Sequence, residues 1–295
     1  MKDEFVLSIV ISVIYLSLGF LLLHFGQIGF GVSFFVFLPF IIGYVSGTGT
    51  FKKASLWGHS IAIVVFFGLL IAGRLDGMVC VLMGLPLIVI AIAFGLAVKH
   101  IIKVFFLKNP SNQHIVKSTV LPFLLFWVIG VLETELNKDD VAINQVKSEI
   151  ILPYSTLDVY NHIKAVDTLA AKKPFLMKLD LPVPQKCVLE DERVGGLRVI
   201  YFKRGKIVTR ITELDPGKLL KMDVIDYQLT GNRWLEFKEA VYTFEMIRDY
   251  GCKMTRITTY ASSLKPRFYW RTFEKIAIEQ EHEFVFNNLK EDLKP

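Results

Sequence analysis

His282 is the residue best suited to proton transfer in the C-terminal half of the chain, because Glu279, Glu281 and Glu283 lie beside it in the sequence. A carboxylate close to an imidazole fixes its tautomer and raises its pKa, which suits general acid–base catalysis. In a helix, residues one or two positions apart do not face each other, so Glu279 is the neighbour on the same face. His282 is therefore the candidate catalytic residue, and a structural or surface histidine is the alternative that this spacing favours.

Two arginines on neighbouring expected strands, Arg198 and Arg210, could neutralise an acidic ligand inside a domain. Charged side chains are mostly exposed, so the pattern favours outward, solvated positions for both.

Sequence motifs for metal or nucleophilic chemistry are missing. The C-terminal half contains only two histidines, His162 and His282, with no H-E-x-x-H motif and no closely spaced cysteines, so we expect no metal site and no cofactor. The acidic run Glu190–Glu192 suits a solvated turn better than a calcium site. There is also no G-x-S-x-G motif and no Gly-rich loop before a helix, so no enzyme class is indicated.

The three cysteines carry little chemistry. Cys80 lies in an apolar run, whereas Cys187 and Cys252 lie in the C-terminal half. A disulfide between the latter two is possible outside the cytoplasm. Two unpaired thiols are the favoured interpretation.

Charge divides the chain into two parts. The first 132 of the 295 residues contain 8 of the 34 Lys and Arg and 3 of the 28 Asp and Glu. The net charge of +6 therefore splits into +5 on this apolar part and +1 on the remainder, which argues against a nucleic-acid partner. We predict a membrane region at 1–132, a linker at 133–142 and a soluble domain at 143–295, with the lipid bilayer as a partner.

Five apolar segments are expected to cross the membrane, each spanning a hydrocarbon core of ~30 Å. They are residues 5–25, 28–47, 54–73, 77–98 and 115–132. The uncharged part of the fifth, Ser118–Leu132, is only 15 residues long, and it crosses only if Ile115 and Val116 join it while Lys117 reaches the interface. His24 and His59 lie near helix ends and are interpreted as interfacial residues, so the helices form an anchor.

The distribution of lysines sets the predicted topology. Lys52 and Lys53 follow the second segment, four lysines (Lys99, Lys103, Lys108 and Lys117) follow the fourth, and the opposite side has only Arg74. By the positive-inside rule, the N-terminus is cytoplasmic. Five crossings place the C-terminal domain outside the cytoplasm of a bacterial inner or cell membrane, and four would leave it in the cytosol.

The C-terminal half reads as an α+β domain. An alternating strand at Gln145–Leu152 is followed by a helix that begins after Ser155, and then by an irregular apolar segment, Lys173–Pro184. That segment either packs over a core or lies against a membrane. Six further strands are expected at Lys186–Asp191, Leu197–Arg204, Lys206–Leu214, Leu219–Tyr227, Glu236–Ile247 and Lys253–Tyr260.

A long helix from Arg267 to about Leu293 closes the sequence. Pro266 suits its first turn, and no Gly or Pro interrupts it. Its expected apolar face consists of Tyr269, Phe273, Ile276, Ala277, Phe284 and Leu289.

This order of elements resembles the helix-grip fold of the START-like, or SRPBCC, superfamily, which includes polyketide cyclase/dehydrase-like and lipid-transfer proteins. The likeness is carried by Gly195–Arg198, Phe202–Gly205, Ile211–Pro216 and Thr258–Trp270, and it extends over about residues 143–294. It also matches a histidine to His282. The resemblance implies a curved antiparallel sheet wrapped on the C-terminal helix, with a hydrophobic cavity between them.

Alternation along the strands and the helix face select the residues expected to line that cavity. They are Tyr242, Phe244, Met246, Met254, Tyr260, Tyr269, Phe273, Ala277 and Phe284. The leading hypothesis is membrane-anchored binding or transfer of a lipid or another hydrophobic small molecule. A cyclase-, dehydratase- or hydrolase-type enzyme using His282, and a ligand-sensing module, are the alternatives. No feature of the sequence indicates an oligomeric state.

Overall fold

The computed structural model describes residues 2–46, 53–73, 78–105, 120–138, 140–229, 234–247 and 251–294. The chain forms two compact units. The first consists of Met1–Asp140 with Ser263–Arg267, and the second of Val141–Ser262 with Phe268–Pro295. The main division lies inside the linker expected at 133–142, whereas the grouping of 263–267 with the first unit was not expected.

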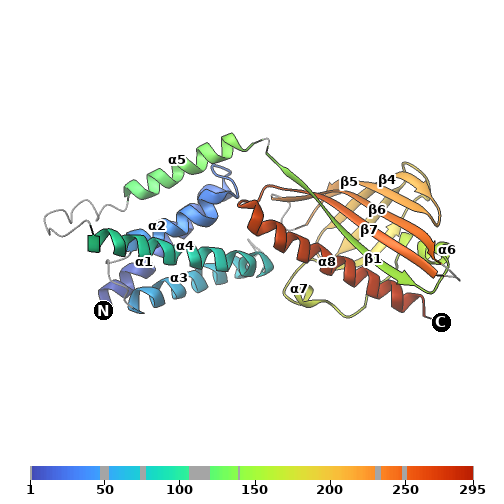
Figure 1. Cartoon of the computed structure of the whole chain (residues 1–295), viewed down its shortest axis with the longest axis horizontal. Coiled ribbons are helices and arrows are strands. Elements are labelled where there is room, and N and C mark those ends of the chain that lie inside the picture. The colour runs from blue at the N-terminus through green and yellow to red at the C-terminus, as the bar shows by residue number, and fades with distance from the viewer. Residues whose placement is uncertain are drawn as a thin grey trace. The chain divides into compact units, whose positions relative to one another are not determined.

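The first unit is helical (Figure 1). Its elements are α1 (Lys2–His24), the short π-helical segment η1 (Ser33–Phe37), α2 (Leu38–Ser46), α3 (Lys53–Ala72), α4 (Met78–Phe105) and α5 (Val120–Leu136).

Two helices in the described part of this unit, Phe5–His24 and Met78–Phe105, are long and apolar enough to cross a membrane. Ser33–Ser46 and Leu56–Ala72 are apolar but shorter. Core helices of soluble proteins share these properties, so length and composition alone do not define a membrane protein. Residues 115–119, where the fifth predicted span begins, lie outside the described residues, as do Lys52, Arg74, Lys108 and Lys117.

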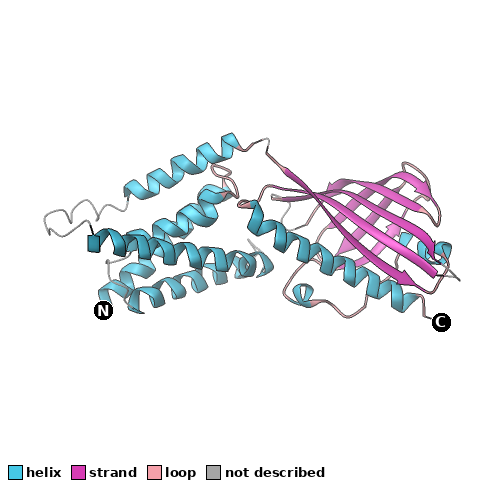
Figure 2. Ribbon diagram, viewed as in Figure 1, coloured by secondary structure: helices cyan, strands magenta, loops and turns pink. Residues whose placement is uncertain are grey.

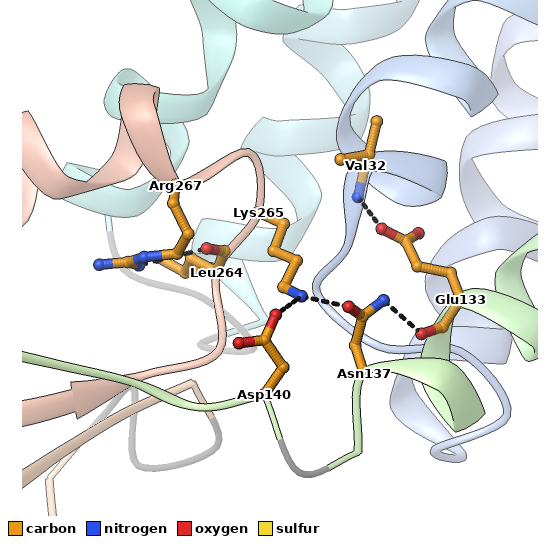
Figure 3. Close-up of polar contacts among 7 residues, drawn as sticks. All are labelled: Val32, Glu133, Asn137, Asp140, Leu264, Lys265 and Arg267. Atoms are coloured by element: carbon orange, nitrogen blue, oxygen red, sulfur yellow. Dashed lines mark hydrogen bonds and ion pairs between the residues drawn. The ribbon is translucent and has the colours of Figure 1, made fainter.

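The second predicted span, residues 28–47, is not one continuous helix. Gly26 has a φ of 70°, a left-handed conformation that ends α1, and the helical path resumes only near Ser33. The end of α5 holds this interruption in place. The Glu133 carboxylate accepts hydrogen bonds from the backbone N–H groups of Val32 (2.7 Å) and Ser33 (2.8 Å), as Figure 3 shows for Val32. The prediction failed because these contacts, 100 residues apart in sequence, have no local signal.

His59, predicted to be interfacial, makes polar contacts with two other helices. Its side chain is buried inside the helical unit, where the two ring nitrogens lie 2.8 Å from Ser12 Oγ and 2.8 Å from Ser46 Oγ. His24, in contrast, is exposed. Polar groups therefore lie inside this unit, among helices whose outer surfaces are apolar.

The segment Ser263–Arg267 is held to the first unit by Lys265 (Figure 3). Its backbone N–H donates to Phe30 O (3.0 Å), and its ammonium group lies 2.6 Å from Asp140 Oδ2 and also donates to Asn137 Oδ1. The hydrogen bond and charge of Lys265 lower the pKa of Asp140. These contacts explain why the segment belongs to the helical unit.

The second unit contains one curled antiparallel sheet with the long helix α8 (Arg267–Asp292) lying across it (Figures 1 and 2). The strands are β1 (Ala142–Leu152), β2 (Pro184–Leu189), β3 (Leu197–Phe202), β4 (Lys206–Asp215), β5 (Leu219–Tyr227), β6 (Leu235–Ile247) and β7 (Gly251–Ser262). Their order is β1-β7-β6-β5-β4-β3-β2. The predicted helix-grip arrangement and its seven strands are thus confirmed.

The end of β3 differs from the prediction because of the turn that follows it. β3 ends at Phe202 and not at Arg204, because the hairpin needs residues 203–205, with Gly205 at a φ of 88°. Residues 230–233 and 248–250, which lie between predicted strands, are outside the described residues.

Two short helices complete the unit. Ser155 caps α6 (Thr156–Lys164) by accepting from the N–H of Asp158 at 3.1 Å, as its sequence predicted. The apolar segment Lys173–Pro184 contains α7 (Phe175–Lys178), and its Met177 packs with Phe284 of α8. This segment covers the core, which was the first of the two predicted alternatives.

Candidate ligand-binding site beneath the C-terminal helix

The buried face of α8 is offset from the predicted apolar face. The buried residues are Trp270, Glu274, Ile278, His282, Phe284, Val285, Phe286, Asn288 and Leu289. Of the predicted face, Ile276 is exposed, and Tyr269, Phe273 and Ala277 are half-buried. The error arose because two polar residues, Glu274 and His282, occupy the centre of the buried face, and a hydrophobic pattern gives such residues no weight.

The buried residues predicted to line a cavity belong to three different core clusters. Tyr242, Phe244 and Met254 are buried together in the main core cluster, with Met222 of β5 beside them. Tyr260 belongs to a second cluster with Ile278, and Phe284 to a third. Met246 is 79% exposed because it lies one residue from the end of β6, so it does not line the interior.

His282 is completely buried between α8 and the sheet. One ring nitrogen, Nε2, lies 2.8 Å from Thr258 Oγ1 on β7, and Nδ1 lies 2.8 Å from Ser148 Oγ on β1. Burial, and then the charge of Arg256, lower the pKa of His282 to about 2. The imidazole is therefore neutral at neutral pH, with both nitrogens hydrogen-bonded to hydroxyl groups. This geometry suits fixing α8 to two strands better than transferring a proton.

Arg256 of β7 forms the charged centre of the interior. Its side chain is 8% exposed, and its two terminal nitrogens lie 3.2 and 2.8 Å from the Glu281 carboxylate oxygens. The guanidinium carbon lies 5.4 Å from the centroid of the Tyr242 ring, a cation–π distance. Burial opposes the charge, but Glu281 holds the pKa of Arg256 above its ordinary value.

Arg198 of β3 approaches the same aromatic ring. Its guanidinium carbon lies 5.8 Å from the Tyr242 centroid, and its nitrogens donate to the backbone carbonyls of Lys164 (2.9 Å) and Ile163 (3.0 Å) at the end of α6. A cation is favourable at a helix C-terminus. The expectation that Arg198 faces solvent was wrong, since it is 4% exposed, whereas Arg210 is exposed as predicted.

A separate buried acidic residue, Glu274, lies about two turns before His282 on α8. The buried Glu274 accepts hydrogen bonds from Ser262 Oγ at 2.6 Å and from the Tyr260 hydroxyl at 3.1 Å. This group ties the start of α8 to the end of β7.

Sequence reasoning missed Arg256 and Glu274. Arg256 alternates with Met254 and Thr258 along β7, so the period-two pattern that selected Met254 also places Arg256 on the inner face. Glu274, Ile278 and His282 recur every four residues, which is a helical face. The strand alternation at Arg256 and the helical spacing at Glu274 were therefore present in the sequence, but charged residues are not expected on a buried face.

Both C-terminal cysteines, Cys187 and Cys252, are buried and unpaired, as favoured from the sequence. Within the described residues, no group of three or more His, Cys, Asp or Glu side chains is arranged to hold a metal ion.

Comparison with known proteins gives a likeness of structure only. No protein-family model matches the chain, and no curated protein matches it in sequence. Solved structures match its C-terminal half. A protein from Chromobacterium violaceum is 16% identical over 52% of this chain and 98% of its own, with a TM-score of 0.36.

Two other matches are enzymes. Truncated norcoclaurine synthase from Thalictrum flavum is 13% identical over 52% of this chain and 96% of its own (TM-score 0.35). The Zhui aromatase/cyclase from Streptomyces sp. R1128 is 9% identical over 51% and 93% (TM-score 0.36). At these identities and TM-scores, the matches say nothing about the activity of this chain.

Proposed function

We propose that the C-terminal domain binds a lipid or another hydrophobic small molecule between its sheet and α8. The observation that carries this proposal is the composition of the space that α8 covers. Aromatic and methionine side chains are buried there beside an arginine and a histidine, Arg256 and His282. Binding sites for small molecules are typically apolar with a few placed polar groups, and methionine adapts to ligands of varied shape.

We further propose that the N-terminal helices hold this domain at a membrane. In both long helices, more than half of the residues in the most apolar 18-residue stretch are not buried. Exposed large apolar residues recur along them, for example Val10 and Ile14 of α1 and Ile90 and Phe94 of α4. Extended apolar surfaces are rare on soluble monomers, and they suit contact with lipid. Buried His59, bonded to two serines, fits an interior that is more polar than the outer surface.

Native mass spectrometry of the full chain, purified in detergent and then delipidated, tests the binding proposal. The spectrum before delipidation is expected to show an additional mass that corresponds to a copurified lipid or small hydrophobic molecule. After delipidation, added lipid should restore a saturable additional mass. A chain that carries no such mass and takes up none contradicts the proposal.

The membrane proposal has separate tests. The chain should remain in the membrane fraction after extraction with alkaline carbonate, and release would contradict anchoring. With a cytoplasmic N-terminus and five crossings, alkaline phosphatase fused after Pro295 should be active. A fluorescent cytosolic fusion at the same position would instead indicate an even number of crossings.

A further inference from the structure

Within the described residues of the C-terminal domain, one buried donor, Arg256 Nε, has no hydrogen-bond partner. Arg256 uses both terminal guanidinium nitrogens on Glu281, but its Nε is buried and makes no hydrogen bond. Buried polar groups in folded proteins are nearly always paired, because an unpaired donor loses the hydrogen bond that it made to water. The unpaired Nε therefore marks a position where an acceptor is expected.

The charges around this position do not balance. Arg198 on β3 and Arg256 on β7 both lie within cation–π distance of the Tyr242 ring on β6. Glu281 supplies one negative charge, whereas Arg198 is bonded to backbone carbonyl oxygens. Glu274, the other buried acid, lies two turns away on α8 and is bonded to two hydroxyl groups. Two guanidinium groups thus lie over the Tyr242 ring, and Glu281 is the one carboxylate within the described residues that is paired with either of them. Buried charge is costly unless it is paired.

The register of the sheet places apolar side chains beside Arg256. Arg256 lies opposite Tyr242 on β6 and Ser148 on β1, and the neighbouring cross-strand pair is Phe244 with Met254. The methionine is completely buried. A head group at Arg256 would therefore have hydrocarbon side chains next to it.

From these observations, we infer that the ligand of this domain is a monoanionic amphiphile, a carboxylate with a hydrocarbon tail, whose head group accepts a hydrogen bond from Arg256 Nε. This inference rests on the proposed function and specifies its ligand class. One unpaired donor and one excess positive charge match a single carboxylate, and a hydrogen bond between a guanidinium and a carboxylate is strong because both groups are charged. A neutral lipid would leave the charge excess in place.

Equilibrium binding of radiolabelled hexadecanoate to the full delipidated chain in detergent tests the inference, with hexadecanol as the neutral analogue of equal tail length. We expect saturable binding of hexadecanoate and at least about tenfold weaker binding of hexadecanol, equivalent to one charge-assisted hydrogen bond. Equal affinity for the two molecules would overturn the inference and leave the proposed function intact. Failure of both to bind, together with no lipid in the native mass spectrum, would contradict the proposed function as well.

Two substitutions at the ion pair locate the head group. Arg256→Lys keeps the charge and the partner Glu281 but removes the Nε donor, so hexadecanoate affinity should fall by about tenfold. Glu281→Gln removes the competing carboxylate and frees the terminal nitrogens, so affinity should rise by about threefold or more. A purely structural ion pair predicts no rise for Glu281→Gln. Arg210→Lys, on the exposed side of β4, is the matched control and should change nothing.

Circular dichroism and thermal unfolding verify that each variant is folded. If Arg256→Lys does not fold, the Glu281→Gln result decides: tighter hexadecanoate binding supports the inference, and unchanged or weaker binding overturns it.

Discussion

The imidazole Nε2 of His282 lies 2.8 Å from the Thr258 hydroxyl, which joins the middle of α8 to β7. Because Nδ1 is bonded to Ser148 on β1, one side chain links the helix to two adjacent strands. Burial of this neutral imidazole makes the stability of the domain depend on pH.

The pKa of His282 is lowered to about 2 in the folded chain, against an ordinary value of 6.5. The unfolded chain therefore binds a proton first as the pH falls, so the stability from the neutral imidazole is complete above about pH 6.5 and decreases below it. Between pH 8 and pH 5 the loss is about 2 kcal/mol, at about 1.4 kcal/mol for each pH unit below the unfolded pKa.

His282→Gln should remove this dependence, and His162→Gln, at an exposed position on α6, should retain it. Unfolding of the C-terminal domain followed by near-UV circular dichroism at several pH values measures both. Parallel stability curves for the wild type and His282→Gln would show that His282 is not the titrating group.

Asn288 holds the loop that precedes α7. Its Oδ1 accepts from the backbone N–H groups of Ala170 (2.7 Å) and Ala171 (2.8 Å), and its Nδ2 donates to Phe284 O. Asn288→Ala leaves two backbone donors without this acceptor, so it should destabilise the domain by about 2–4 kcal/mol. Asn287→Ala, at the half-buried neighbouring position, should cost less than about 1 kcal/mol. Equal losses in chemical denaturation would contradict the role of Asn288.

Gly205 combines a left-handed backbone with a crowded site. Its φ is 88°, and a Cβ atom would lie 1.7 Å from Gln228 O. Gly205→Ala should therefore destabilise the domain by more than about 3 kcal/mol, through backbone strain and displacement of Gln228. Gly195 has nearly the same φ, 87°, with nothing within 4 Å, so Gly195→Ala should cost only about 1–2 kcal/mol. Similar melting temperatures for the two variants would show that contact with Gln228 is unimportant.

Local sequence patterns predicted the elements of the C-terminal domain because strands and turns have short-range signals. Alternation gave the first strand, strand-like runs between turn residues gave the other six, and Ser155 marked the start of α6. The same patterns did not predict the face that α8 buries, since Glu274 and His282 satisfy their polar groups through β7 and β1, far away in the sequence.

The candidate site was predictable only in its apolar part. Tyr242 and Met254 were selected by alternation, whereas Arg256 was not, because a buried arginine depends on Glu281, 25 residues further on. In the helical unit, the burial of His59 had no local signal for a similar reason, because its partners Ser12 and Ser46 come from two other helices. Sequence patterns indicate which faces are apolar, and three-dimensional contacts decide which polar groups join them.

Photo-cross-linking with a hexadecanoate that carries a diazirine near the end of its tail tests the central claim most directly. Peptide mapping of the full chain should locate the cross-links on the inner faces of β6, β7 and α8, around Phe244 and Met254, and excess unlabelled hexadecanoate should abolish them. Cross-links confined to the N-terminal helices, or cross-links that excess unlabelled hexadecanoate does not reduce, would contradict a ligand site beneath α8.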